Sequence, residues 1–459
     1  MPLNDDTIAQ TVLFPDLVTK PLIATFDQAH ASSDGGAILL KAADRRLQLT
    51  TRLAACLTDG RDPARVTHAL QDLVAQRVFG IACGYPDAND GDRLAEDPIQ
   101  KLLLDRHPVD GRSLASQPTV SRFENGVGPR ALYRLGRELA AGVIDRHRQR
   151  LRGRARRITI DLDVTDDPTH GAQQLTFFHG HYDAWCYLPV LAFLTFNDEP
   201  EQYLCAAVLR PGNAATAIGA AGLLARLVGL LREAFPRTRL RVRLDGGFAH
   251  PGLLDQLDAA GVEYVVAMPS NAVLNRHAEP LMIDVRTAVA ALGATAHVYG
   301  DTHYAAGTWA GPRRIIIKAE VVHLAGRDAR DNPRFVITNL RQTPQWIYEH
   351  VYCQRGEIEN RLKELHHGLE IDRTSCTRFW ANQLRVLLTA AAYVLFQELR
   401  LRAARTAYAR AQVTMLRERL LKIGTHVVAS ARRYVLHLPR AFPDVRAWQT
   451  IASRLGASG

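Results

Sequence analysis

The spacing of apolar residues divides the chain into a helical part followed by a part that alternates between strands and helices. From residue 35 to about 150, apolar residues recur every three or four positions, which predicts a mostly helical region. The first such stripe consists of Leu39, Leu40, Ala43 and Leu47. Asp97 followed by Pro98 is typical of a helix N-cap with proline at the first helical position.

The pattern changes to strands after residue 156. In Arg157–Val164 the aliphatic residues face one way, whereas Asp161 and Asp163 face the other. Further strands are predicted at 175–182, 187–196, 240–244 and 263–268, with helices at 214–235 and 251–260. Three strands in a meander, followed by helices that alternate with two more strands, is the order of a ribonuclease-H-like core.

Additional strands, including 314–322 and 334–339, are expected before the chain becomes helical again, with a later helix at 382–402 and one or two strands at 427–438. We therefore predict an α/β chain (α+β overall) whose ribonuclease-H-like core is interrupted by a β-rich insertion. The predicted regions are a helical N-terminal region at 1–150, the first part of the core at 151–268, the insertion at 269–342, completion of the core at 343–405 and a basic C-terminal region at 406–459.

One predicted helix, around residue 358, carries an unusual set of polar side chains beside its apolar stripe. At 100° per residue the polar set spans an arc of roughly 80°. It consists of Tyr352, Arg355, Glu359, Lys363 and His366. Taken alone, such an arc is more often a solvated charged face. A carboxylate next to several cations can also hold a metal ion beside a phosphate group.

The charge of the chain favours a polyanionic partner. Charged residues make up 23% and hydrophobic residues 47%, which is ordinary for a globular protein. The formal net charge of +10 favours nucleic acid before membrane. The segment from Arg146 to Arg157 contains seven arginines and no acid. Either simple solvation or contact with a phosphate backbone explains this run, and we favour backbone contact. The candidates are Arg148, Arg150, Arg152 and Arg154.

The cysteines and apolar segments indicate a cytoplasmic protein. The six cysteines show no Cys-x-x-Cys spacing, so a zinc ribbon is not expected and they are interpreted as core thiols of a reducing compartment. The N-terminus has no signal-peptide pattern. Arg226 interrupts the apolar stretch at 215–231, so no membrane span is predicted there.

Three acids occupy positions that this fold would bring together. Asp163 ends the first predicted strand, Asp245 ends the fourth, and Glu359 lies on the later helix. Mg²⁺ and Mn²⁺ prefer carboxylate oxygens, and a pair of ions needs a bridging carboxylate. A strand-end aspartate taken alone is more often a turn or cap residue. Asp161 shares the face of Asp163 and competes with it as a ligand.

Two further features have a structural and a functional interpretation. His179-Gly-His181 could form a metal pair, although alternate residues on a strand beside acids are more often surface polar groups. Trp309 could stack on a flipped base, although a packed indole is the commoner role. The small polar residues and arginine near Ser116 suit a helix-turn-helix facing DNA, with a plain helical bundle as the alternative.

Together these motifs resemble bacterial insertion-sequence transposases of the Asp-Asp-Glu (DDE) type, in the group called transposase DDE domain group 1. Tyr352, Arg355 and Glu359 match its Tyr-x2-Arg-x3-Glu-x6-Lys signature. Its last position is His366 here, and Lys363 lies one turn earlier. The sequences after Asp163 and around Asp245 are similar to the two aspartate motifs of the group. The resemblance covers roughly residues 20 to 440.

The resemblance implies a cut-and-paste transposase that binds terminal inverted repeats and target DNA, cleaves through hairpin ends, and acts as a homodimer in its synaptic complex. It implies two Mg²⁺ (or Mn²⁺) ions on Asp163, Asp245 and Glu359. Phosphate contacts would come from Tyr352, Arg355 and either Lys363 or His366. Two alternatives stay open: an inactive relative that only binds DNA, and a ribonuclease-H-like nuclease without strand transfer.

Overall fold

The N-terminal part of the protein is helical, as predicted. The computed structural model describes residues 12–458, so residues 1–11, where the sequence predicts no signal peptide, lie outside the described residues. The helices are α1 (Ile38–Leu47), α2 (Leu49–Ala55), α3 (Leu70–Cys83), α4 (Asp90–Arg93), α5 (Pro98–Leu103), α6 (Gln117–Gly126) and α7 (Pro129–Arg150). The predicted cap at α5 is confirmed, because Asp97 accepts hydrogen bonds from the backbone of Ile99 and Gln100.

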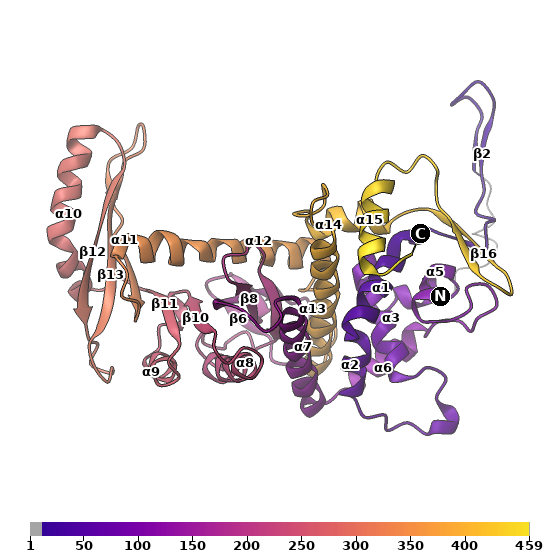
Figure 1. Cartoon of the computed structure of the whole chain (residues 1–459), viewed down its shortest axis with the longest axis horizontal. Helices are drawn as coiled ribbons and strands as arrows, with labels where there is room; N and C mark the ends of the chain where they lie inside the picture. The colour runs from indigo at the N-terminus through magenta and orange to yellow at the C-terminus, as the bar shows by residue number, and fades with distance from the viewer. Residues whose placement is uncertain (1–11, 459) are drawn as a thin grey trace.

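A nine-stranded sheet forms the other half of the elongated molecule (Figure 1). Its strands lie in the order β12-β13-β15-β11-β10-β4-β8-β9, and β14 pairs with β13. Strands β4, β10 and β11 are parallel, whereas β8 is antiparallel to β4 and β9 is antiparallel to β8. The bounds are β4 (Arg157–Val164), β8 (Val190–Phe196), β9 (Tyr203–Val208), β10 (Arg239–Leu244), β11 (Glu263–Met268), β12 (Ala296–Tyr304), β13 (Arg313–Val322), β14 (Arg330–Asp331) and β15 (Arg334–Thr338).

The predicted element order β-β-β-α-β-α-β is present, but one strand of the predicted meander is wrong. The segment 175–182 does not enter the main sheet, and β9 takes the third place instead. Strand β9 was missed because all but its last residue are buried, so its sequence does not alternate. The segment 175–182 contributes β6 to a small separate sheet made of β5 (Asp167–Pro168), β6 (Phe177–His179) and β7 (Ala184–Tyr187).

The segment expected to interrupt the core extends its sheet. Strand β15 pairs antiparallel with β11, so β12 to β15 continue the same sheet outward. The predicted strands at 314–322 and 334–339 are confirmed by β13 and β15. A long helix that the sequence analysis did not predict, α10 (Ala272–Leu292), precedes them and packs on β12 and β13. The five region boundaries themselves stay predictions.

The central helix α13 (Phe379–Arg402) closes the open edge of the sheet. It is long and apolar enough to cross a membrane, but 94% of its most apolar window is buried inside the protein. Its side-chain amides replace a missing neighbour strand: Gln397 accepts a hydrogen bond from the backbone of Leu204 at 3.1 Å, and Gln383 accepts one from Leu209 at 2.7 Å. These backbone N–H groups along the edge of β9, which have no neighbouring strand, thereby gain hydrogen-bond partners.

A continuous helical run from residue 344 to 368 lies across the sheet (Figure 1). It is not a uniform α-helix: α11 (Pro344–Ile347) and α12 (Glu357–Lys363) alternate with π-helical turns at Tyr348–Tyr352 and Glu364–Gly368 and a 3₁₀ turn at Cys353–Gly356. The ideal spacing of 100° per residue therefore only approximates the polar arc. Such π-turns are often found at functional sites.

The remaining elements connect the strands of the sheet and form the two ends of the chain. Helices α8 (Ala220–Ala234) and α9 (Pro251–Ala259) connect β9 to β10 and β10 to β11. The N-terminal strands β1 (Val12–Phe14) and β2 (Leu22–Ala24) form an isolated hairpin. The C-terminal part contains α14 (Val413–Leu416), β16 (Thr425–Ala429), β17 (Tyr434–His437) and α15 (Val445–Leu455), and β16 pairs with β3 (Ala31–Ser32). The strands predicted within 427–438 are thus confirmed.

Candidate active site

Asp163 and Asp245 lie side by side at one edge of the sheet. Strands β4 and β10 are parallel with Asp161 opposite Arg243, so the residues two positions later emerge together at the carboxyl ends. Asp163 is 8% exposed and accepts a hydrogen bond from the backbone of Val164 at 2.9 Å. Asp245 is more accessible and accepts a hydrogen bond from Gly247 N at 2.9 Å, which caps a 3₁₀ turn.

Arg355 joins the two aspartates. Its Nη2 atom lies 2.9 Å from Oδ1 of Asp163 and 3.6 Å from Oδ2 of Asp245, while its buried Nε has no hydrogen-bond partner among the described residues. Burial raises the pKa of Asp163 to about 6, although the guanidinium of Arg355 opposes this shift and the carboxylates of Asp245 and Glu359 add to it. This pair of carboxylates therefore shares a single cation in a half-buried setting.

Glu359 does not join the pair directly. It is exposed on α12, and its effect on the pKa of Asp163 is the smallest of the causes named. Within residues 12–458 no group of three or more histidine, cysteine or acidic side chains is arranged to hold a metal ion. The structure therefore brings together two of the three predicted carboxylates and leaves the third outside.

His366 and Lys363 differ in how they are held. The Nε2 atom of His366 lies 2.9 Å from the hydroxyl of Thr165, and its Nδ1 lies 3.1 Å from Oδ2 of Asp372. Although burial opposes it, the hydrogen bond from His366 lowers the pKa of Asp372. Lys363 is exposed, and its side chain has no hydrogen bond or ion pair with any described residue. Lys363 is thus free to bind a ligand, whereas both ring nitrogens of His366 have partners within the protein.

Tyr352 is half-buried at the end of the π-helical turn Tyr348–Tyr352. Its ring lies 5.3 Å from that of Tyr348. Burial raises the pKa of Tyr352, the guanidinium of Arg355 acts against this shift, and the carboxylate of Asp245 adds to it. Arg355 therefore contacts the aspartate pair, and the charges of Arg355 and Asp245 both act on the phenol of Tyr352.

Asp161, the competing ligand, is not accessible. It is fully buried, and Arg243 donates to its two oxygens at 2.7 Å each while Gln202 donates at 3.0 Å. Both carboxylate oxygens are therefore engaged within the protein. This ion pair serves the packing of β4 against β10 and leaves nothing to bind an ion.

The arginine-rich segment lies at the opposite end of β4 from Asp163, about 20 Å away at 3.3 Å per residue. Some of its members are already neutralised: Arg150 pairs with Glu199 at 2.8 Å, and Arg146 pairs with Glu398 at 2.8 Å. Arg148, Arg152 and Arg154 are exposed and form no ion pair with described residues. The phosphate contact predicted for Arg150 would require it to leave Glu199.

The structure favours the structural interpretation of the two other candidates, which are the pair His179 and His181 and the indole of Trp309. His179 and His181 have ring centroids 6.4 Å apart, and no third ligand converges on them within the described chain. Trp309 packs edge-on against Tyr304 at 5.4 Å and lies beside the hydrophobic core. The packed-indole interpretation of Trp309 therefore agrees with the structure.

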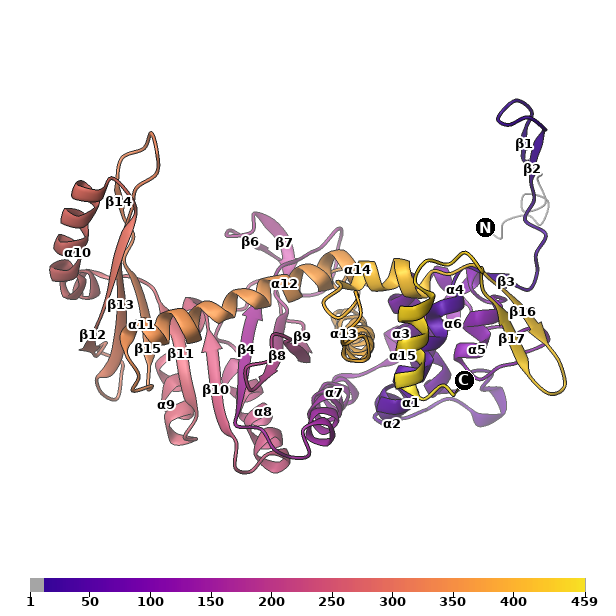
Figure 2. The same cartoon turned by 45° about the horizontal axis from the view of Figure 1, so that its top comes forward.

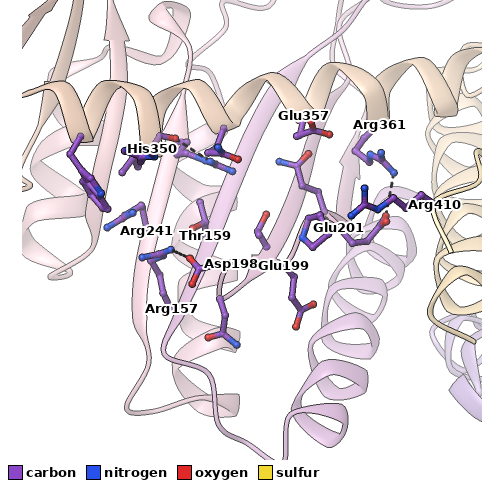
Figure 3. A pocket seen from close by; sticks show the side chains of 18 of the residues that line it. Arg157, Thr159, Asp198, Glu199, Glu201, Arg241, His350, Glu357, Arg361 and Arg410 are labelled. Carbon is purple, nitrogen blue, oxygen red and sulfur yellow. Dashed lines mark hydrogen bonds and ion pairs between the residues drawn. The ribbon is translucent and has the colours of Figure 1, made fainter. Parts of the chain in front are cut away.

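A polar cavity of about 870 Å³ lies between the sheet and the helical run (Figure 3). Arg157 and Thr159 line it from β4, and Glu357 and Arg361 line it from α12. It was missed by the sequence analysis because its walls are far apart in the chain. Most of its charges are paired, for example Arg361 with Glu201 at 3.3 Å. The cavity lies toward the amino end of β4, away from Asp163.

The sequence analysis also missed the link from Asp372 through His366 to Thr165. These three residues come from three separate segments, so periodicity carries no signal for their contact. The only hint is the position of His366 where the signature has lysine. This link attaches the end of β4 to the end of the helical run.

Comparison with known proteins identifies the family. The model of the family described as "Transposase DDE domain group 1" matches residues 14–459. No match was found among curated proteins. Among solved structures, the chain is similar to a piggyBac transposase synaptic complex with hairpin DNA, with 9% identity and a TM-score of 0.38 over 84% of this chain and 77% of that one.

A second solved structure, a Mos1 transposase paired-end complex with the left transposon end, has 14% identity and a TM-score of 0.17 over 47% of this chain and 62% of that one. Both scores are too low to support a statement about this molecule. The family match, in contrast, extends over nearly the whole described chain and includes the segments that carry Asp163, Asp245 and Arg355. The chain therefore belongs to the transposase DDE domain group 1 family.

Proposed function

We propose that this transposase binds the terminal inverted repeats of an insertion sequence and performs metal-dependent strand cleavage and strand transfer. The observation that carries this proposal is the pair of carboxylates, Asp163 and Asp245, at the shared edge of two parallel strands with one cation between them. The strand order β9-β8-β4-β10-β11 supports a ribonuclease-H-like core.

The donor set suits a divalent metal. Asp163, Asp245 and Glu359 would hold Mg²⁺ or Mn²⁺, two ions per site, because these ions prefer carboxylate oxygens. Bound there, the ions would supply a nucleophile of lowered pKa and charge stabilisation for the leaving oxygen. The fit rests on Asp163 and Asp245, whose facing carboxylates are already compensated by a cation, Arg355. Glu359, exposed on α12 and outside this pair in the structure, would be the third donor.

The surrounding residues would hold the DNA backbone. Arg355 is the cation nearest to the carboxylates, and Lys363 is an exposed cation two helical turns further along. Both would bind phosphates, with the phenol of Tyr352 beside them. We assign His366 a positioning role, because it connects Thr165 at the end of β4 to Asp372.

DNA away from the site would meet the helical N-terminal region and the free arginines. We propose that the helices within residues 1–150 recognise the repeats and that Arg148, Arg152 and Arg154 neutralise phosphates. We also propose a homodimer in the synaptic complex and hairpin ends as the cleavage route.

The test is cleavage of a duplex that carries the inverted repeat, with Asp163→Asn, Asp245→Asn and Glu359→Gln as variants. Each should lose Mg²⁺-dependent nicking and keep DNA binding, because the amide preserves size and removes the charge that holds the ion. Glu357→Gln is the matched control on the same helix, since Glu357 is exposed two residues earlier. Joined products in the wild type distinguish a transposase from a nuclease. Nicking by Glu359→Gln at the control rate would remove Glu359 from the site.

A further inference from the structure

The loop that follows β9 starts at the edge of the sheet that carries the aspartate pair. Strand β9 is antiparallel to β8, and β8 is antiparallel to β4, so β9 runs in the direction of β4 and ends at the same edge. Val164, Val190 and Val208 lie in one register across these three strands. Figure 2 shows β10, β4, β8 and β9 side by side beneath the helical run at α12. The chain has to pass from β9 to β10, on the far side of β4, and residues 209–219 begin this crossing.

A buried arginine, Arg210, holds this loop. Its Nε atom donates to the backbone oxygen of Leu188 at 2.9 Å. Its Nη1 atom donates to three backbone oxygens of the loop at 2.9 to 3.2 Å, those of Ala215, Thr216 and Ile218. Burial lowers the pKa of Arg210 to about 10, and Arg210 forms no ion pair with any residue of the described range 12–458. All of its hydrogen-bond acceptors are backbone oxygens, so what Arg210 fixes is the course of the loop.

The loop reaches the second aspartate through Thr216. A Cβ atom at Gly247 would lie 2.7 Å from Cγ2 and 2.9 Å from Oγ1 of Thr216, so the side chain of Thr216 packs directly on the backbone of Gly247. The backbone nitrogen of Gly247 in turn donates to Oδ1 of Asp245 at 2.9 Å. With Oδ1 held in this way, Oδ2 of Asp245 lies 3.6 Å from Nη2 of Arg355. A continuous set of contacts therefore connects Arg210 to the carboxylate of Asp245.

Asp245 needs such support more than Asp163 does. Asp163 lies within β4, whereas Asp245 lies in the turn that follows β10. The side chain of Asp245 is 35% exposed, compared with 12% for the side chain of Asp163. An exposed carboxylate in a turn has more orientations open to it than a buried one in a strand. Groups that orient a ligating carboxylate affect metal affinity although they do not touch the metal.

We propose that Arg210 is a positioning residue for Asp245: by holding the loop 211–219 against Gly247, it fixes the orientation in which the Asp245 carboxylate would bind a metal ion. This inference rests on the proposed function, because that function gives Asp245 its role as a ligand. The planar guanidinium of Arg210 bridges carbonyl oxygens in two directions, whereas the ammonium group of a lysine is a compact point charge. Arg210→Lys therefore keeps the charge and loses the bridge.

Hydrogen–deuterium exchange of the metal-free protein, measured by mass spectrometry, tests the positioning without DNA or cleavage. The hydrogen bond to Asp245 protects the amide of Gly247, so a peptide that spans residues 244–250 reports on it. Arg210→Lys should speed exchange in this peptide by about fivefold, as expected for the loss of one hydrogen bond. Thr216→Gly should have the same effect, because it removes the contact with Gly247 and leaves the arginine in place.

Arg314→Lys is the matched control. Arg314 lies on β13, and its Nη1 atom also bridges two backbone oxygens, those of Leu340 at 2.7 Å and Gln342 at 2.9 Å. This variant should leave exchange in the peptide 244–250 unchanged. Wild-type exchange there in both Arg210→Lys and Thr216→Gly would overturn the proposal. Faster exchange throughout the sheet in both variants would show a general structural role and would overturn it as well.

The affinity for Mn²⁺, measured by titration calorimetry, connects the loop to the carboxylate. Arg210→Lys should lower the affinity of the wild type by about tenfold. It should have no further effect in the Asp245→Asn background, because the carboxylate that it positions is already absent. An equal loss in both backgrounds, or no loss in either, would overturn the proposal. Absence of Mn²⁺ binding by the wild type would contradict the proposed function, whereas the exchange experiment would still decide whether Arg210 orients Asp245.

Discussion

Two aspartates on the same face of β4 show how a structural ion pair differs from a candidate site. Asp161 is fully buried, and Arg243 from the neighbouring strand engages both its oxygens. Asp163, two residues later, has only one close contact with Arg355, and that arginine also contacts Asp245. Asp161 therefore has a complete set of partners, whereas Asp163 and Asp245 share an incomplete one at an accessible edge. All of these aspartates pair with an arginine, so pairing alone does not distinguish a structural ion pair from a candidate site. The difference is whether every carboxylate oxygen has a partner within the protein.

The largest expected difference is in stability. Asp161→Ala should lower the free energy of unfolding by about 3–5 kcal/mol, because it leaves the buried charge of Arg243 without a partner. Asp163→Ala should cost little, since it relieves the repulsion from Asp245 and leaves Arg355 with another carboxylate. Urea denaturation followed by circular dichroism measures both. Equal losses would mean that the two aspartates have the same structural role.

The second difference is in pH dependence. The pKa of Asp163 is raised to about 6 in the folded protein, above the ordinary value of 3.8. The folded state therefore binds more protons between these values, so its stability should decrease as pH rises from about 4 to about 6. The decrease attributable to Asp163 is roughly 3 kcal/mol at most. Denaturation of metal-free wild type and Asp163→Asn across this range isolates it, because the variant lacks the group. Parallel curves would show that the pKa is not raised.

The smallest difference concerns the two basic groups of the polar arc. Lys363→Ala should weaken DNA binding and reduce the slope of log affinity against log salt by about 0.9, as expected for one lost phosphate contact. His366→Ala should leave that slope unchanged, because both nitrogens of His366 contact protein groups. For the same reason, wild type and His366→Lys should have parallel binding profiles from pH 6 to 8.5. If the wild type binds DNA more weakly than His366→Lys at high pH, His366 is the phosphate contact.

The sequence analysis predicted local features well. Strand β4 was predicted with its observed bounds, because its aliphatic and polar residues alternate cleanly. The cap of α5 was predicted from Asp97 and Pro98. The aspartate pair was predicted from the strand ends, since the carboxyl ends of parallel neighbouring strands meet at one edge.

Contacts between distant segments that the predicted strand order does not bring together were not predicted. Strand β9 is buried without alternation, and its edge is satisfied by Gln383 and Gln397 from a helix nearly two hundred residues later. The contacts of Arg355 with the aspartates and of His366 with Thr165 also join distant segments. Helical periodicity placed Arg355 and His366 on one arc, but it carries no information about what that arc faces.

Binding of Mn²⁺ to the protein without DNA, measured by titration calorimetry, tests the central claim most directly. The account predicts that wild type and the Glu357→Gln control bind Mn²⁺ alike, while Asp163→Asn and Asp245→Asn lose at least about tenfold in affinity because each removes a carboxylate ligand. Asp163→Asn that binds Mn²⁺ as tightly as wild type would contradict the assignment of the aspartate pair as the metal site.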